Sequence, residues 1–192
     1  FRGCWEAMDR ETGDLHYLKI IEKSQLETPK MTDNFSSEIN LFGTLDFPTI
    51  PKLISFFSDE SNFYVVFERP ESKSLLEHIE KNGKIEDCSY LKNFSISFMD
   101  TIQYLLSNID SPIQRSISTE TIFINDDGSI SQIFVIIKNS NLVSLNDEIS
   151  MKTTAPETIT HNKVSQKCMS WILGCELFFI SNGFFPFEGN TI

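Results

Sequence analysis

The sequence predicts an α+β protein with two unequal lobes, because strand patterns come first and helical patterns dominate the remainder. Its 192 residues are enough for one domain with a sizeable core. Hydrophobic residues make up 40% and charged residues 22%, which is the profile of a globular protein and not of a disordered chain. We therefore expect one folded domain over residues 1–192.

Two hairpin patterns predict the first sheet. Residues 6–9 and 15–21 flank a Thr-Gly-Asp turn, and residues 53–57 and 63–67 flank a polar turn. Strand-forming residues on both sides of a short turn are typical of antiparallel pairs, so both segments are expected to form β-hairpins.

Between the hairpins, the sequence predicts a loop and then a helix. Residues 24–34 are mostly polar and contain Pro29, which favours a loop. From Ser36 onward, apolar residues recur with helical spacing, and Phe47-Pro48-Thr49 predicts the end of that helix.

The second half combines helical patterns with two short strands. Helices are predicted at 74–80, 86–108 and 168–181, and strands at 121–124 and 133–137. The segment from the second strand to Pro156 is polar and irregular, so no regular element is expected there.

Composition narrows the classes of partner. The net charge of −11, from 16 basic and 27 acidic residues, argues against nucleic acid or an anionic membrane as the main partner. The most apolar segment, 171–187, contains Glu176 and Asn182 and predicts a buried helix and turn, not a membrane span.

The four cysteines have no metal-binding or C-x-x-C spacing, which predicts free thiols and a cytoplasmic protein. The three histidines are too scattered to predict a metal site or an acid–base pair.

Several short motifs follow one another in a fixed order. They are Leu45–Leu53, Phe63–Glu68, residues 114–124, Ala155-Pro156-Glu157, the helix with Trp171 and Gly174, and Gly183–Phe187. In this order and spacing they resemble a protein kinase, most similar to the serine/threonine kinases of the calmodulin-dependent type. The resemblance covers essentially the whole chain.

This resemblance implies a two-lobed protein-kinase-like fold, with a small β-rich N-lobe (1–68) and a mainly helical C-lobe (69–192). It also implies truncation at both ends. The chain begins within the family's glycine-rich loop and stops before the family's last helices, so the C-lobe is expected to be incomplete.

Two residues match the family's nucleotide-binding pair. Lys19 falls on the strand lysine that pairs with the phosphates of the nucleotide, and Glu38 falls on the helix glutamate that orients this lysine. The resemblance implies them as cofactor-binding residues. The alternative is a vestigial ion pair that only holds the small lobe together.

The departures from the family fall on its chemistry. In the catalytic loop Gln114, Ser116, Ser118 and Thr121 replace the family's His, Asp, Lys and Asn. The D-F-G motif aligns, by spacing from the preceding strand, with Lys138-Asn139-Ser140, and the helix aspartate that anchors the catalytic loop aligns with Met169. We therefore expect no catalytic residue and no metal-binding residue.

The expected space for adenine is also altered. Tyr17 stands where the family has a small roof alanine, and Phe123 stands where it has the floor leucine. Two large rings in these positions would fill much of the pocket, so binding of ATP and Mg²⁺ is expected to be weak or absent and no cofactor is expected.

These observations predict a pseudokinase that acts as a protein-interaction, scaffold or regulatory module, with a protein partner and without nucleic acid or membrane. One alternative is an unconventional, weakly active ATP-dependent serine/threonine kinase that uses Glu120 and Asp126 as substitute metal ligands. The other is a truncated relic without a function of its own.

Overall fold

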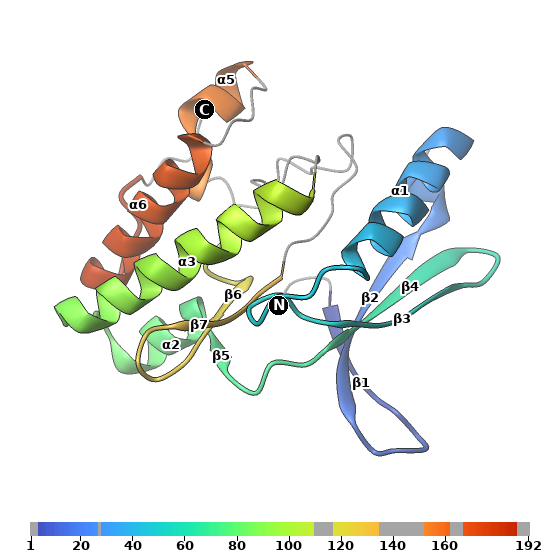
Figure 1. Ribbon diagram of the computed structural model, residues 1–192, viewed down its shortest axis with the longest axis horizontal. Coiled ribbons are helices and arrows are strands. Elements are labelled where there is room, and N and C mark those ends of the chain that lie inside the picture. The colour runs from blue at the N-terminus through green and yellow to red at the C-terminus, as the bar shows by residue number, and fades with distance from the viewer. Residues whose placement is uncertain (1–3, 27, 110–116, 135–151, 162–166, 188–192) are drawn as a thin grey trace.

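Two antiparallel hairpins form the four-stranded sheet of the small lobe in the computed structural model, which describes residues 4–26, 28–109, 117–134, 152–161 and 167–187 (Figure 1). The strands are β1 (Cys4–Met8), β2 (Leu15–Glu22), β3 (Leu53–Ser58) and β4 (Asn62–Glu68). Their order in the sheet is β1-β2-β4-β3. Both predicted hairpins are confirmed.

The tight turn between β1 and β2 is held by one carboxylate. The Asp9 Oδ1 atom accepts hydrogen bonds from the backbone N–H groups of Glu11 (2.7 Å) and Thr12 (3.2 Å). Gly13 has φ 80°, a left-handed conformation that glycine adopts without steric cost. The turn residues therefore explain why the first hairpin closes here.

Helix α1 (Pro29–Phe42) covers one face of this sheet and begins earlier than predicted. The sequence placed Pro29 in a loop, but proline fits the first position of a helix because its missing N–H has no partner there. A short 3₁₀ turn, η1 (Lys23–Gln25), precedes the helix. The Phe35 ring packs on the Phe63 ring at 5.3 Å and the Phe42 ring on the Phe67 ring at 5.5 Å, so aromatic contacts fix the helix to β4.

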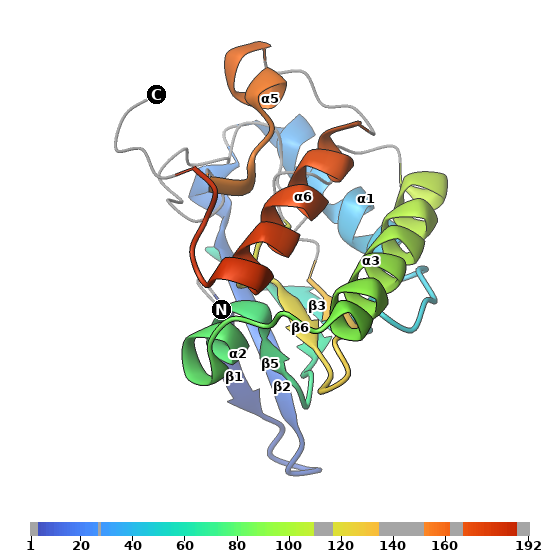
Figure 2. The ribbon, with the colours of Figure 1, turned by 90° about the vertical axis from the view of Figure 1, so that its left-hand side faces the viewer.

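The second lobe consists mainly of helices α2 (Leu75–Asn82), α3 (Cys88–Asn108) and α6 (Lys167–Asn182). Ser74 caps α2 with a reciprocal capping box in which Glu77 participates, and the Asp87 side chain caps α3. The long helices α3 and α6 lie side by side (Figure 1 and Figure 2). A short helix, α5 (Pro156–His161), was not predicted.

A small sheet, β5 (Lys73–Ser74), β6 (Ile122–Ile124) and β7 (Ile130–Ile133), lies where the two lobes meet. The Ile133 N–H donates to the Thr49 carbonyl oxygen at 2.7 Å, which ties this sheet to the segment before β3. Strand β7 begins three residues earlier than the predicted strand at 133–137 and ends at Ile133. The earlier end of β7 changes which residue follows the strand, and therefore which residue aligns with the start of the family's D-F-G motif.

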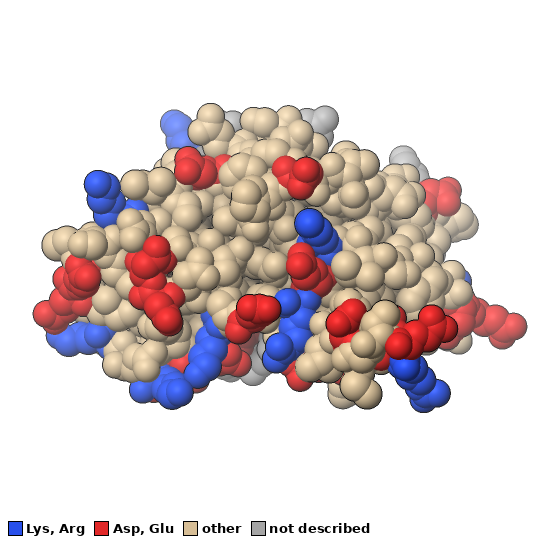
Figure 3. Space-filling view, turned by 60° about the horizontal axis from the view of Figure 1, so that its bottom comes forward, with Lys and Arg blue, Asp and Glu red and all other residues tan. Residues whose placement is uncertain are grey.

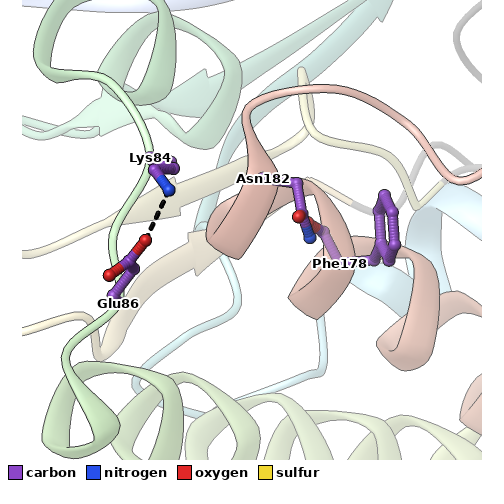
Figure 4. Close-up of polar contacts among 4 residues, drawn as sticks. All are labelled: Lys84, Glu86, Phe178 and Asn182. Atoms are coloured by element: carbon purple, nitrogen blue, oxygen red, sulfur yellow. Dashed lines mark hydrogen bonds and ion pairs between the residues drawn. The ribbon is translucent and has the colours of Figure 1, made fainter.

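The connection between α2 and α3 packs against the end of α6 (Figure 4). The Ile85 N–H donates to the Ile180 carbonyl oxygen at 2.8 Å, and an exposed ion pair between Lys84 and Glu86 lies beside it. The Asn182 Nδ2 atom donates to the Phe178 carbonyl oxygen at 2.9 Å and satisfies one of the last carbonyls of α6. These contacts tie the connection between α2 and α3 to the end of α6.

All four cysteines lie in the described part of the chain and are free thiols, as predicted. Within the same part, no helix combines the length and apolar character needed to cross a bilayer.

Candidate functional site

Three aromatic side chains from the two lobes meet between the four-stranded sheet and the small sheet. Tyr17 comes from β2, Phe123 from β6, and Phe134 follows β7 directly. Their ring centroids lie 6.1 Å (Tyr17–Phe123), 5.6 Å (Tyr17–Phe134) and 5.4 Å (Phe123–Phe134) apart. We call these three residues the inter-lobe aromatic cluster.

The cluster continues into the small lobe. The Phe134 ring lies 5.9 Å from the ring of Phe67, which in turn contacts Phe42 of α1. Phe123 and Phe134 are only 3% and 2% exposed. Burial also raises the pKa of the half-buried Tyr17 hydroxyl. Apolar packing therefore runs from α1 through β4 to the small sheet.

An ion pair joins the edge of the small lobe to the segment that links the lobes. The Arg69 Nε atom donates to the Glu6 Oε1 atom at 2.8 Å, and Glu6 lies directly opposite Tyr17 in the β1–β2 ladder. The next residue in the link, Pro70, has no backbone N–H. The segment that links the lobes therefore begins with a paired cation and a residue that cannot donate a backbone hydrogen bond.

The predicted nucleotide-binding residues lie on elements that face each other. Lys19 is opposite Val65 in the β2–β4 ladder, on the sheet face that α1 covers. Glu38 lies within α1, but its side chain is outside the described part of the structure. The Lys19–Glu38 ion pair therefore stays a prediction.

The described half of the catalytic-loop segment is a closed turn. Gln114, Arg115 and Ser116 lie outside the described residues, whereas Ile117 to Thr121 lie within them. The Thr121 Oγ1 atom accepts from the Ser118 N–H at 2.9 Å and donates to the Ser118 carbonyl oxygen at 3.1 Å. Thr121 occupies the position of the family's metal-binding Asn, and its hydroxyl bridges its own turn.

Neighbouring elements hold this turn from both sides. The Leu76 N–H at the start of α2 donates to the Thr119 carbonyl oxygen at 3.1 Å. The Phe134 N–H donates to the Thr121 carbonyl oxygen at 2.9 Å. The turn is therefore part of the packed core, in agreement with the 6% exposure of Ser118 and of Thr121.

Phe134 is the residue that the sequence analysis missed. The expected motif at Lys138-Asn139-Ser140 was placed immediately after the strand predicted at 133–137, and those three residues lie outside the described part. Strand β7 ends at Ile133, so the same rule places the first residue of the motif at Phe134. The uninterrupted apolar run from Ile133 hid the end of the strand, because a continuous run carries no periodicity.

The substitute metal ligands considered from the sequence do not gather. Glu120 is half-buried in the turn, whereas Asp126 lies on the β6–β7 turn in a surface pocket of about 510 Å³ that Lys73 and Lys81 also line. A hydrogen bond with Lys81 and repulsion from its charge lower the pKa of Lys73. Glu71 and Asp126 line the same pocket, so it carries both signs of charge. Among the described residues, no three His, Cys, Asp or Glu side chains form a group able to hold a metal ion. Mg²⁺ binds oxygen ligands, often one or two carboxylates beside the substrate phosphates, whereas Glu120 and Asp126 lie at opposite ends of β6.

Glu157 of α5 and Met169 of α6 align with two family motifs, and both contribute to the packing of the helices. Met169, where the family has its anchoring aspartate, is 2% exposed and belongs to the apolar core. The Cys168 thiol donates to the Glu157 Oε1 atom at 3.4 Å, which links the Ala-Pro-Glu motif to α6. These contacts hold α5 and α6 together and place an apolar side chain in the core at position 169.

Comparison with known proteins places the chain in one family. The family model of the protein kinase domain matches residues 1–192. Serine/threonine-protein kinase polo of Drosophila melanogaster is 27% identical over 203 residues, which cover 100% of this chain and 34% of that protein. Serine/threonine-protein kinase plk-2 of Caenorhabditis elegans is 26% identical over 200 residues, which cover 100% of this chain and 30% of that protein.

Both curated relatives are about three times as long as this chain. The crystal structure of Rad53 1-466 in complex with AMP-PNP shares the fold, with a TM-score of 0.71 at 24% identity over 98% of this chain and 46% of that one. The two-lobed architecture, the ordered motifs and the match of the whole chain lead to the same conclusion. The chain belongs to the protein kinase family.

Proposed function

We propose that this domain is a pseudokinase, which uses the kinase fold to bind a protein partner and does not transfer phosphate. The observation that supports this most strongly is the inter-lobe aromatic cluster. Its three rings come from both lobes and contact one another directly.

The spacing of these rings argues against a nucleobase between the lobes. A flat ring placed between two others needs about 3.5–4.0 Å to the atoms on each side, or roughly 7–8 Å in all. The Tyr17 and Phe123 centroids are 6.1 Å apart, and Phe134 packs against both rings. A nucleobase would have to displace at least one buried ring. Pro70 also removes one backbone donor from the link between the lobes.

At the described positions, the side chains that phosphoryl transfer needs have been replaced. Transfer needs metal ligands and a group that orients the nucleophile. Thr121 donates and accepts within its own turn, and Phe134 brings a phenyl ring to the position after β7. Groups that act as a unit are not replaced one at a time, so we assign neither catalytic nor metal-binding residues.

The surface charge favours a protein partner over nucleic acid. Basic and acidic side chains are interspersed on the face drawn in Figure 3, and the whole chain carries a net charge of −11. Nucleic-acid binding depends on clustered Lys and Arg that neutralise phosphates. The free thiols are typical of proteins in reducing compartments, and we place the domain in the cytoplasm.

Thermal unfolding with ATP and Mg²⁺ tests the proposal. We expect an unchanged melting temperature in the wild type and in Lys19→Ala. We expect a saturable rise in the variant Tyr17→Ala/Phe123→Leu, which opens the space between the lobes. A saturable rise in the wild type that Lys19→Ala removes would refute the proposal.

A transfer assay provides the second test. Incubation with labelled ATP, Mg²⁺ and a generic protein substrate should leave both the domain and the substrate unlabelled. Transfer that Lys19→Ala abolishes would establish the unconventional kinase instead. The same assay on Phe57→Ala, a variant of the opposite sheet face, controls for general damage to the small lobe.

A further inference from the structure

Two apolar rows cross the face of the four-stranded sheet that lies opposite α1. In the first row Trp5 pairs with Leu18, which pairs with Val66, and in the second Ile20 pairs with Tyr64, which pairs with Phe57. Residues paired directly across strands lie on the same face of a sheet. The outer apolar patch is therefore formed by Trp5, Leu18, Ile20, Phe57, Tyr64 and Val66.

This patch is open to solvent although it is rich in aromatic side chains. Trp5 is 64% exposed, Phe57 52% and Ile20 40%. The Phe57 and Tyr64 rings stack with centroids 5.0 Å apart, so they present one flat surface. Helix α1 packs on the other face, against Phe63 and Phe67. A contiguous exposed patch of this kind is typical of an interaction site.

Acidic residues border the patch on both sides along the strands. Along the strands, Glu68 follows Val66 on the same face beyond the first row, and Glu22 follows Ile20 beyond the second row. Asp59 and Glu60 lie in the adjoining β3–β4 turn and are exposed. Hydrogen bonds from the Tyr64 hydroxyl and from backbone N–H groups hold the pKa of Asp59 below its ordinary value, so this carboxylate stays charged.

Two lysines lie near these borders and leave the balance acidic. The Lys23 ammonium donates to the Asp59 carbonyl oxygen and lies 4.9 Å from the centre of the Phe63 ring. The Lys52 carbonyl oxygen accepts from the Glu68 N–H, which places Lys52 beside the other border. Four carboxylates against two ammonium groups therefore favour a partner with basic residues on both sides of an apolar stripe.

We propose that the outer apolar patch docks a basic amphipathic helix of a protein partner. The three spacings between the four strands span about 14 Å, which corresponds to roughly ten residues of helix. A helix lying along the two rows would place its apolar stripe on the rings and its flanking Lys or Arg residues near the acidic borders. The inference rests on the protein-binding part of the proposed function and names its surface and the chemistry of its partner.

Trp5 provides a reporter inside the patch. In a Trp171→Phe background, Trp5 is the remaining tryptophan, so its fluorescence reports on this surface alone. The probe is a designed helical peptide of about 18 residues with leucines along one face and lysines on both sides of it. We expect a saturable blue shift, protection of Trp5 from acrylamide, and weaker binding at high salt because the exposed charges are screened.

Matched variants separate this surface from general hydrophobicity. Ile20→Thr/Phe57→Thr keeps strand propensity, and we expect it to weaken binding at least about 10-fold. Ile96→Thr/Met99→Gln removes side chains of 50% and 46% exposure from α3, and we expect unchanged affinity. Circular dichroism and melting temperature confirm that both variants fold.

Three results would overturn the inference. One is equal affinity of the Ile20→Thr/Phe57→Thr variant and the wild type. The second is equal binding of a peptide with glutamates in place of the lysines. The third is a dimer in sedimentation that dissociates in the Ile20→Thr/Phe57→Thr variant, because a second copy would then be the occupant. All measurements are made without nucleotide, so a failure here is distinct from a rise in melting temperature with ATP.

Discussion

Glu176 is a carboxyl group in the core of the helical lobe, and its ionisation should make stability depend on pH. Its side chain is 0% exposed, and neither carboxyl oxygen has a hydrogen-bond partner among the described residues. Burial raises the pKa of Glu176 from the ordinary value of 4.5 to about 8. The folded protein therefore keeps this group protonated at neutral pH, whereas the unfolded chain releases the proton.

The sign and size of the effect follow from this difference. Between about pH 5 and pH 8 the folded state binds one proton more than the unfolded state, so stability falls as pH rises. Each pH unit in this window lowers the free energy of unfolding by about 1.4 kcal/mol. From pH 5 to pH 7 the loss is about 3 kcal/mol, and it levels off above the folded-state pKa.

Urea unfolding of the wild type and of Glu176→Gln over pH 5–9 measures how the free energy of unfolding depends on the ionisation of Glu176. Glutamine has nearly the same shape and does not ionise. We therefore expect the two proteins to have similar free energies of unfolding at pH 5, and the wild type to be less stable by a few kcal/mol at pH 8. Glu80→Gln, an exposed site on α2, is the control and should keep the wild-type slope. The neighbouring Cys175 thiol, with a pKa of about 11, titrates above this window. Equal pH slopes in the wild type and in Glu176→Gln would refute the reasoning.

Three further predictions concern the frame of the helical lobe. Ser74→Ala removes the capping box with Glu77 and should cost about 1 kcal/mol in urea unfolding, and Ser74→Asp, which also caps helices, should restore most of it. Gly128→Ala should lower the melting temperature, because φ is +85° and the new Cβ would lie 2.6 Å from the Tyr90 ring. The strain and the clash should together cost at least about 2 kcal/mol, and equal stability of this variant would show that the turn relaxes freely. Phe98→Ala should cost about 3–5 kcal/mol because the ring is 0% exposed, and a loss below about 1 kcal/mol in calorimetry would contradict close packing between α3 and its neighbours.

Much of the fold was readable from the sequence because its signals are local. The polar turns at 12–14 and 58–61, each between strand-forming residues, predicted both hairpins. The apolar spacing of 86–108 predicted α3 almost to the residue. Errors arose where a local signal has two interpretations. Pro29 interrupts a helix in its interior but starts one at its first position, and here it starts α1.

The candidate site was only partly readable. The substitutions at Ser118, Thr121 and Met169 are visible in the sequence, because each is a change of residue type within a recognisable pattern. The role of Phe134 was not, since its place depends on the end of β7 inside a continuous apolar run. The sequence likewise placed Glu176 in a buried helix but did not reveal that its carboxyl group has no hydrogen-bond partner in the described part of the chain.

By itself, the sequence determined the family frame and which polar groups had been replaced, because both are properties of residue type and spacing along the chain. The tertiary structure alone decided that Tyr17, Phe123 and Phe134 contact one another, and that Trp5, Ile20 and Phe57 share an open face. These residues are far apart in the chain, and strand order and register bring them together. Local periodicity shows which face of a strand is apolar, but only packing decides which apolar faces meet and which one stays exposed.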